Sequence, residues 1–139
     1  MSRALPKYSK AAAVVQSLIF GIAQGVPLTA FEAHTIKFTM PQRGKILGVR
    51  LNVGLRGGTF NVGTVDVKAA GTSILTAAFD VAALTPATPV DKEIADLSAT
   101  GLALIEANTE MTIVVAVTTG TSPTWADVTV QIEYLPYGG

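Results

Sequence analysis

The sequence contains a single histidine, His34, so any chemistry that needs several histidines is excluded from the outset. A zinc site requires three or four ligands, and of the potential ligands only Glu32 stands near His34 in the chain. No serine lies in the Gly-x-Ser-x-Gly elbow of the hydrolases. We therefore interpret His34 as a polar residue at the start of a strand, and the sequence predicts no metal-binding, cofactor-binding or catalytic residues.

The carboxylates do not form a recognisable site either. The aspartates lack the Asp-x-Asp-x-Asp spacing of a calcium loop, although carboxylates brought together by the fold, as in glycosidases, remain an alternative. The glycine-rich stretch Gly54–Gly63 has neither the dinucleotide fingerprint nor the Gly-Lys-Ser/Thr of a phosphate-binding loop. We expect this stretch to be an exposed structural loop, and the protein to be neither an enzyme nor a binder of a small-molecule substrate.

The composition indicates that part of the surface is covered. Of the 139 residues, 49% are hydrophobic and 14% are charged, whereas about a quarter of the residues of a typical soluble domain are charged. Contacts between copies of the chain would explain this, and a plain apolar β-domain is the alternative. The absence of cysteine excludes disulfides. The formal net charge of zero argues against nucleic acid as a direct partner.

The N-terminal segment differs from the remainder in charge. The first ten residues include Arg3, Lys7 and Lys10 and no acidic residue. We expect residues 1–16 to form an extended arm and residues 17–139 to form one domain. The apolar run from Ala11 to Ala23 has two other interpretations, the core of a signal peptide and a short amphipathic helix. The run is too short for a transmembrane helix, so no membrane partner is expected.

Alternation of apolar and polar residues predicts a series of short strands. They cover residues 17–24, 33–40, 45–53, 62–69, 110–118 and 126–135, and a return strand after the Ala70-Gly71 turn makes a hairpin of residues 62–77. Residues 79–84 suit a strand or a turn, residues 91–97 suit a helical turn or an edge strand, and residues 119–124 are expected to be a loop. Seven or eight strands without a long helix predict an all-β, jelly-roll-like antiparallel β-sandwich.

Two segments contain candidate binding residues. The predicted strand at residues 110–118 is apolar on both faces, so Val114 and Ala116 are candidates for a contact between subunits. Trp125 follows a Ser-Pro-Thr segment. Its ring could stack on a sugar, or it could close one end of the sandwich.

Three segments carry a resemblance to a known family. They are His34–Val49 (HTIKFTMPQRGKILGV), Thr64–Leu75 (TVDVKAAGTSIL) and Ala126–Tyr134 (ADVTVQIEY). In this order they resemble the small jelly-roll modules of tailed-phage virion proteins, which include capsid decoration proteins, head fibres and tail-fibre tips. The resemblance covers roughly residues 17–135. Two departures are Ala70-Gly71, where such modules often have Asn-Gly, and Asn108-Thr109, where Gly-Asp is common.

The resemblance implies a structural virion protein. We expect a capsid decoration, or cement, protein that binds the major capsid protein on the outer surface of a phage head. It would act as a homo-oligomer, which we expect to be a trimer, with Arg3, Lys7 and Lys10 of the arm touching the capsid. The alternative is a carbohydrate- or receptor-binding module of a head fibre or tail fibre, in which Trp125 would meet the ligand. Neither interpretation involves a catalytic residue.

Overall fold

The computed structural model describes residues 14–22, 33–85 and 87–137, with the backbone alone at positions 33, 55–62, 82 and 117–125. The described residues form strands and a few short helical turns, which confirms the predicted all-β class. The strands are β1 (Gln16–Ile22), β2 (Ala33–Thr39), β3 (Gly44–Ala69), β4 (Thr72–Ser73), β5 (Phe79–Asp80), β6 (Val90–Lys92) and β7 (Glu110–Pro136). The helical turns are η1 (Val81–Ala83), η2 (Ile94–Asp96) and α2 (Ala99–Leu102).

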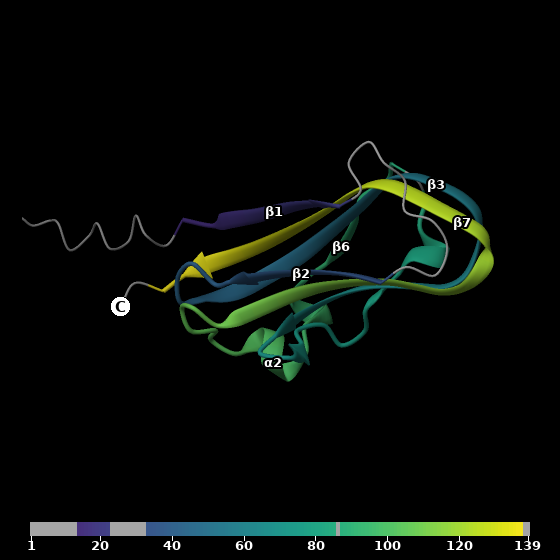
Figure 1. The fold of residues 1–139 in the computed structure, drawn as a ribbon. Coiled ribbons are helices and arrows are strands. Elements are labelled where there is room, and N and C mark those ends of the chain that lie inside the picture. Colours follow the sequence, from purple (N-terminus) through teal and green to yellow (C-terminus); the bar gives the residue numbers. More distant parts are fainter. Residues whose placement is uncertain (1–13, 23–32, 86, 138–139) are drawn as a thin grey trace, which may run out of the picture.

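Two long strands, β3 and β7, organise the fold. They pair antiparallel from Gly44 opposite Pro136 to Ala69 opposite Met111. Figure 1 shows both strands curving together at the end of the molecule away from the C-terminus, so that each passes from one layer into the other. A single hydrogen-bonded sheet is thereby folded into two packed layers, which confirms the predicted antiparallel β-sandwich.

Each layer contains one half of both long strands. In the first layer β1 pairs with the C-terminal half of β7, which pairs with the N-terminal half of β3, and β6 adds to β3. In the second layer β2 pairs with the N-terminal half of β7, and β4 and β5 pair with the C-terminal half of β3. Within the described residues, β1 and β2 are therefore the edge strands on the same side of the sandwich (Figure 1).

The two segments predicted to be loops are strand instead. The stretch Gly54–Gly63 belongs to β3 and residues 119–124 belong to β7, and the two pair with each other where the sheet bends. The register shifts three times in this region, between Gly57 and Thr59 and on both sides of Val62. Glycine in a strand permits a sharp bend, and β-bulges increase it. Residues whose composition is typical of loops therefore form the bend of two continuous, paired strands.

The core lies between the two layers and consists of the alternate residues of each strand that face inward. Alternation predicts one apolar face in each of three strands, and the members of these faces whose side chains are described are all buried: Val65, Val67, Met111, Ile113, Val115, Val128, Val130, Ile132 and Tyr134. Among the residues whose side chains are described, no polar or charged residue is buried. Half-buried apolar residues of β1 and β2 pack against this core at the edge-strand side: Leu18, Phe20, Ile36 and Phe38.

A β-bulge changes the face on which Leu47 lies. Alternation predicts Leu47 on the same face as Val49, but this prediction is wrong. Ile46 pairs with Tyr134 and Gly48 pairs with Glu133, which leaves Leu47 as an extra residue in β3. Because one extra residue reverses the alternation, Ile46 takes the core position with 3% of its surface exposed. Leu47 instead lies on the outer face of the first layer.

The Ala70-Gly71 turn is the predicted hairpin turn. Lys68 pairs with Ser73 and Ala69 with Thr72, so Ala70 and Gly71 form a two-residue loop. Their φ angles are 49° and 86°, the left-handed conformation at both positions that a type I′ turn requires. Gly71 adopts this conformation freely, whereas the Cβ of Ala70 is strained by about 1 kcal/mol.

We expect Ala70→Asn to raise the free energy of unfolding by about 0.5–1 kcal/mol, because asparagine tolerates the left-handed region better than alanine. Thermal unfolding followed by circular dichroism measures the change. The control is Ala77→Asn, at an exposed residue without positive φ, which should leave the melting temperature nearly unchanged. A lower melting temperature for Ala70→Asn would contradict the type I′ assignment.

The two segments that the sequence left open each contain a short strand followed by a helical turn. β5 is followed directly by η1, and β6 is followed by η2 after Glu93. Glu93 and Asp96 form a capping box around η2, in which the backbone N–H of Glu93 donates to Oδ2 of Asp96 at 2.9 Å. The capping box closes η2, and the N–H of Thr76 donates to the carbonyl of Asp96, which attaches this segment to the sandwich. No helix in the described ranges is long and apolar enough to span a membrane.

Candidate functional site

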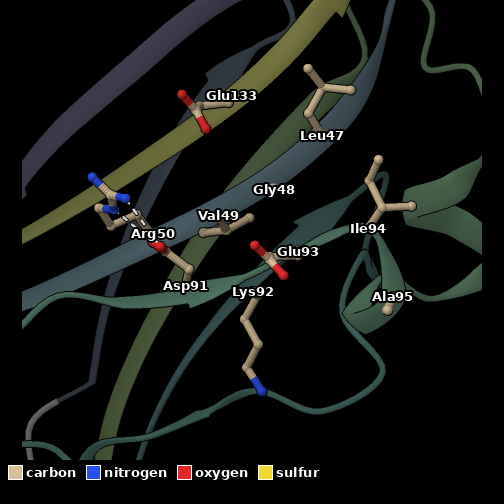
Figure 2. A pocket seen from close by; sticks show the side chains of 10 residues that line it. All are labelled: Leu47, Gly48, Val49, Arg50, Asp91, Lys92, Glu93, Ile94, Ala95 and Glu133. Carbon is tan, nitrogen blue, oxygen red and sulfur yellow. Dashed lines mark hydrogen bonds and ion pairs between the residues drawn. The ribbon is translucent and has the colours of Figure 1, made fainter.

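A groove of about 510 Å³ lies on the outer face of the first layer, between β3 and the β6–η2 segment (Figure 2). The bulge at Leu47 and the missing side chain of Gly48 help to create it, since a Cβ on Gly48 would lie 2.8 Å from the carbonyl oxygen of Lys92. The groove is lined by Leu47, Gly48, Val49, Arg50, Asp91, Lys92, Glu93, Ile94, Ala95 and Glu133. One end is therefore apolar, at Leu47 and Ile94, and the other end is charged.

An ion pair between Arg50 and Asp91 closes the charged end of the groove. Nε of Arg50 lies 2.6 Å from Oδ1 of Asp91, and the second guanidinium contact is 3.0 Å. The hydrogen bond to Arg50 holds the pKa of Asp91 below its ordinary value, and the same bond raises the pKa of Arg50. Both side chains are about half exposed, so solvent screens the pair and it contributes little to stability.

The groove offers no arrangement that resembles a known catalytic or metal site. Glu133 lies opposite Gly48 on β7 and Glu93 follows β6, so β3 lies between the two glutamates (Figure 2). No group of three potential metal ligands occurs within the ranges that the structure describes. The guanidinium of Arg50 is already engaged by Asp91 through two contacts, so it is not available as a free anion-binding group.

A second candidate lies where the arm joins the sandwich, and we call it the arm-side end. It consists of exposed apolar side chains from three separate segments: Val14, Val15, Leu104 and Tyr137. Backbone hydrogen bonds bring the segments of Leu104 and Tyr137 together, because Gly44 bonds to Ile105 in both directions and the N–H of Tyr137 donates to the carbonyl of Arg43. Val14 and Val15 directly precede β1, whose Gln16 pairs with Tyr134 of β7. A shallow cavity of about 480 Å³, lined mainly by alanines and by Leu104, lies beside them. The arm-side end therefore places exposed apolar side chains beside charged groups, because Arg43 pairs with Glu106 and Nζ of Lys45 lies 5.9 Å from the centre of the Tyr137 ring.

Val114 and Ala116 lie on the outer face of the second layer. Both are half-buried, with Val114 between Thr35 and Asp66 in the neighbouring strands. They form a narrow apolar strip in the middle of a polar sheet face, which is the central position that their sequence predicted. Their role as a subunit contact stays a prediction.

The other predicted site residues are not brought together. Arg3, Lys7 and Lys10 lie outside the described residues, and so does the side chain of Trp125, whose backbone pairs with Arg56 in the bend. His34 lies in β2 opposite Val115, at the start of the strand as expected. Sequence patterns did not reveal the arm-side end, because its four residues come from segments that meet only through the fold.

Comparison with solved structures finds the same fold in proteins of distant sequence. The crystal structure of FLHE matches with a TM-score of 0.52 and 13% identity, over 88% of this chain and 98% of that chain. A chain of the cyanophage Pam1 capsid asymmetric unit matches with a TM-score of 0.51 and 22% identity, over 88% and 85% of the two chains. Neither protein-family models nor curated protein sequences give a match.

A third solved structure is more distant. It is the CBM36-1 domain of a multidomain xylanase from the hindgut metagenome of Trinervitermes trinervoides, with a TM-score of 0.45 and 16% identity over 89% of this chain. A score this low carries no argument about this protein. The two closer structures show the fold, and a fold of this kind is shared by proteins of different function.

Proposed function

We propose that this protein is a structural component of a phage virion that decorates the outer surface of the head as a homo-oligomer. The arm-side end is the observation that carries the proposal: its four large apolar side chains are exposed, two of them directly before β1, and the first ten residues of the sequence have three cations and no acidic residue. An apolar patch bordered by charge is typical of a protein-binding surface. The fold shared with a chain of a cyanophage capsid supports the same conclusion.

The mechanism would be burial of apolar area between neighbouring capsid subunits. Leu104 and the adjacent cavity would take up an apolar side chain of the shell, and the cations of the arm would pair with acidic groups on its surface. Burial of apolar surface contributes roughly 25 cal/mol per Å², from which the cost of association must be subtracted. The dry core between the layers would serve as a rigid support for this contact.

Co-sedimentation with empty heads purified without the protein tests the proposal. We expect the full chain to bind to saturation at a fixed number of copies per head. Substituting alanine for Arg3, Lys7 and Lys10 together should weaken binding about tenfold, the effect of losing three exposed ion pairs of about 0.5 kcal/mol each. The matched control substitutes alanine for Lys37 and Lys68, which lie on the outer face of the second layer.

The possible results of this experiment test head binding and the proposed contact surface separately. Failure of the full chain to bind heads at any concentration would overturn the proposal. Equal binding by the arm variant and the control would remove the arm from the contact and leave the arm-side end to be tested by Leu104→Asp. Specific binding to an oligosaccharide in place of heads would favour the receptor-binding alternative.

A further inference from the structure

The edge strand β1 lacks the features that protect edge strands from pairing with another chain. It spans seven residues and pairs with β7, its only neighbour in the part of the chain that the structure describes. Its sequence, QSLIFGI, contains no charged residue and no proline. Edge strands of soluble proteins are commonly short, charged, bulged or interrupted by proline, because an uncharged edge recruits further strands. The edge strand on the same side of the second layer, β2, carries the exposed charge of Lys37.

The side chains of β1 leave apolar surface exposed on both faces. Ile19 lies on the outer face with 64% of its surface exposed, the largest exposed fraction among the large apolar residues described. Leu18 and Phe20 face inward but are half-buried, and the ring of Phe20 lies 4.5 Å from the ring of Phe38 in β2. Among the residues that the structure describes, the side of the sandwich formed by the two edge strands therefore presents partly exposed apolar side chains.

We propose that β1 pairs antiparallel with β1 of a second copy of this protein, about a two-fold axis at Ile19. All seven residues overlap only in the register in which Ile19 faces Ile19 of the second copy. In that register Leu18 meets Phe20 and Ser17 meets Gly21, so each apolar side chain keeps its face of the extended sheet. No charges are brought together within the strand, and the formal net charge of zero adds no repulsion between copies.

The pairing would join the first layers of two copies into one continuous sheet, as in recognition by strand addition. Seven residues of strand extend about 23 Å, and a contact along one strand edge is short beside the surfaces that stable protein interfaces bury. We therefore expect a dimer whose population depends on concentration. The inference concerns how copies associate and stands whether or not the protein binds a capsid. It differs from the trimer that the sequence resemblance implies.

Sedimentation velocity of the full chain over a range of concentrations tests the pairing. We expect wild type to shift from monomer to dimer and Ile19→Lys to remain monomeric, because two lysines would face each other across the axis. Ile19→Glu should also be monomeric, and an equimolar mixture of the two variants should recover the dimer. Ile94→Lys is the matched control, because Ile94 is 54% exposed on η2, outside the proposed interface, and this variant should associate like wild type.

Cysteine substitution tests the register, because the chain has no cysteine of its own. Ile19→Cys should form a disulfide-linked dimer under mild oxidation, since residues directly opposite in an antiparallel pair lie close enough for the bond. Ser17→Cys should not, because it faces Gly21 of the second copy. Dimerisation of Ile19→Lys, or a wild type that is monomeric or trimeric, would overturn the pairing. None of these results would by itself overturn head binding, which co-sedimentation measures separately.

Discussion

Replacing Phe79 by alanine is expected to lower the free energy of unfolding by about 3–5 kcal/mol, the range for truncation of a buried aromatic side chain. Phe79 is 1% exposed and is the largest of the fully buried side chains described. It lies in β5, which pairs with β3 through Thr64 and Val65, and Nζ of Lys92 lies 5.5 Å from the centre of its ring. The truncation would therefore leave a cavity beneath the second layer and weaken the attachment of β5.

Chemical denaturation measures this loss, and the corresponding fall in melting temperature should be roughly 10–20 °C. Phe79→Leu should cost less, about 1–1.5 kcal/mol, because it conserves more of the buried volume. Ile94→Ala is the control for an exposed apolar residue and should change stability by less than about 0.5 kcal/mol. Equal stabilities of Phe79→Ala and Ile94→Ala would show that β5 does not pack as described.

Gly101→Ala is expected to destabilise the protein by about 3 kcal/mol, at the upper end of the cost of overpacking. A Cβ at this position would overlap the carbonyl oxygen of Ile74, and backbone cannot move aside as a flexible side chain does. Gly101 lies in α2, which Ser98 attaches to the neighbouring segment. The hydroxyl of Ser98 donates to the carbonyl of Ser73 at 2.7 Å, and the backbone N–H of Ser98 donates to the carbonyl of Ile74 at 2.8 Å.

Accommodating the methyl group would push α2 away from this segment and break the Ser98 hydrogen bonds, each of which contributes about 0.5–1.5 kcal/mol. Thermal unfolding of Gly101→Ala beside Leu102→Ala provides the comparison. Leu102 is on the same helical turn but 49% exposed, so its truncation should have little effect. A wild-type melting temperature for Gly101→Ala would mean that α2 is not held against Ile74.

Period-two alternation predicted most of the fold from the sequence alone. The inward faces at Val65 and Val67, and at Val128 and Val130, were predicted correctly because alternation reports burial directly wherever one face of a strand meets a core. The turn was predicted because Gly71 adopts a positive φ at little cost, whereas the positive φ of Ala70 is visible only in the structure. The low content of charged residues predicts that part of the surface is covered, and this stays a prediction.

The tertiary structure decided the features that depend on distant segments. Gly54–Gly63 resembles a loop in composition, yet it is strand because residues 117–126 supply hydrogen-bond partners across the bend. Leu47 leaves the core because a bulge reverses the alternation, and a bulge has no fixed sequence signal. The arm-side end contains residues from three segments that are distant in sequence. The edge of β1 is open because, among the described residues, β1 pairs with β7 on one side only. The local sequence predicts which face of a strand a residue occupies, whereas the strands that pair with one another depend on the fold of the whole chain.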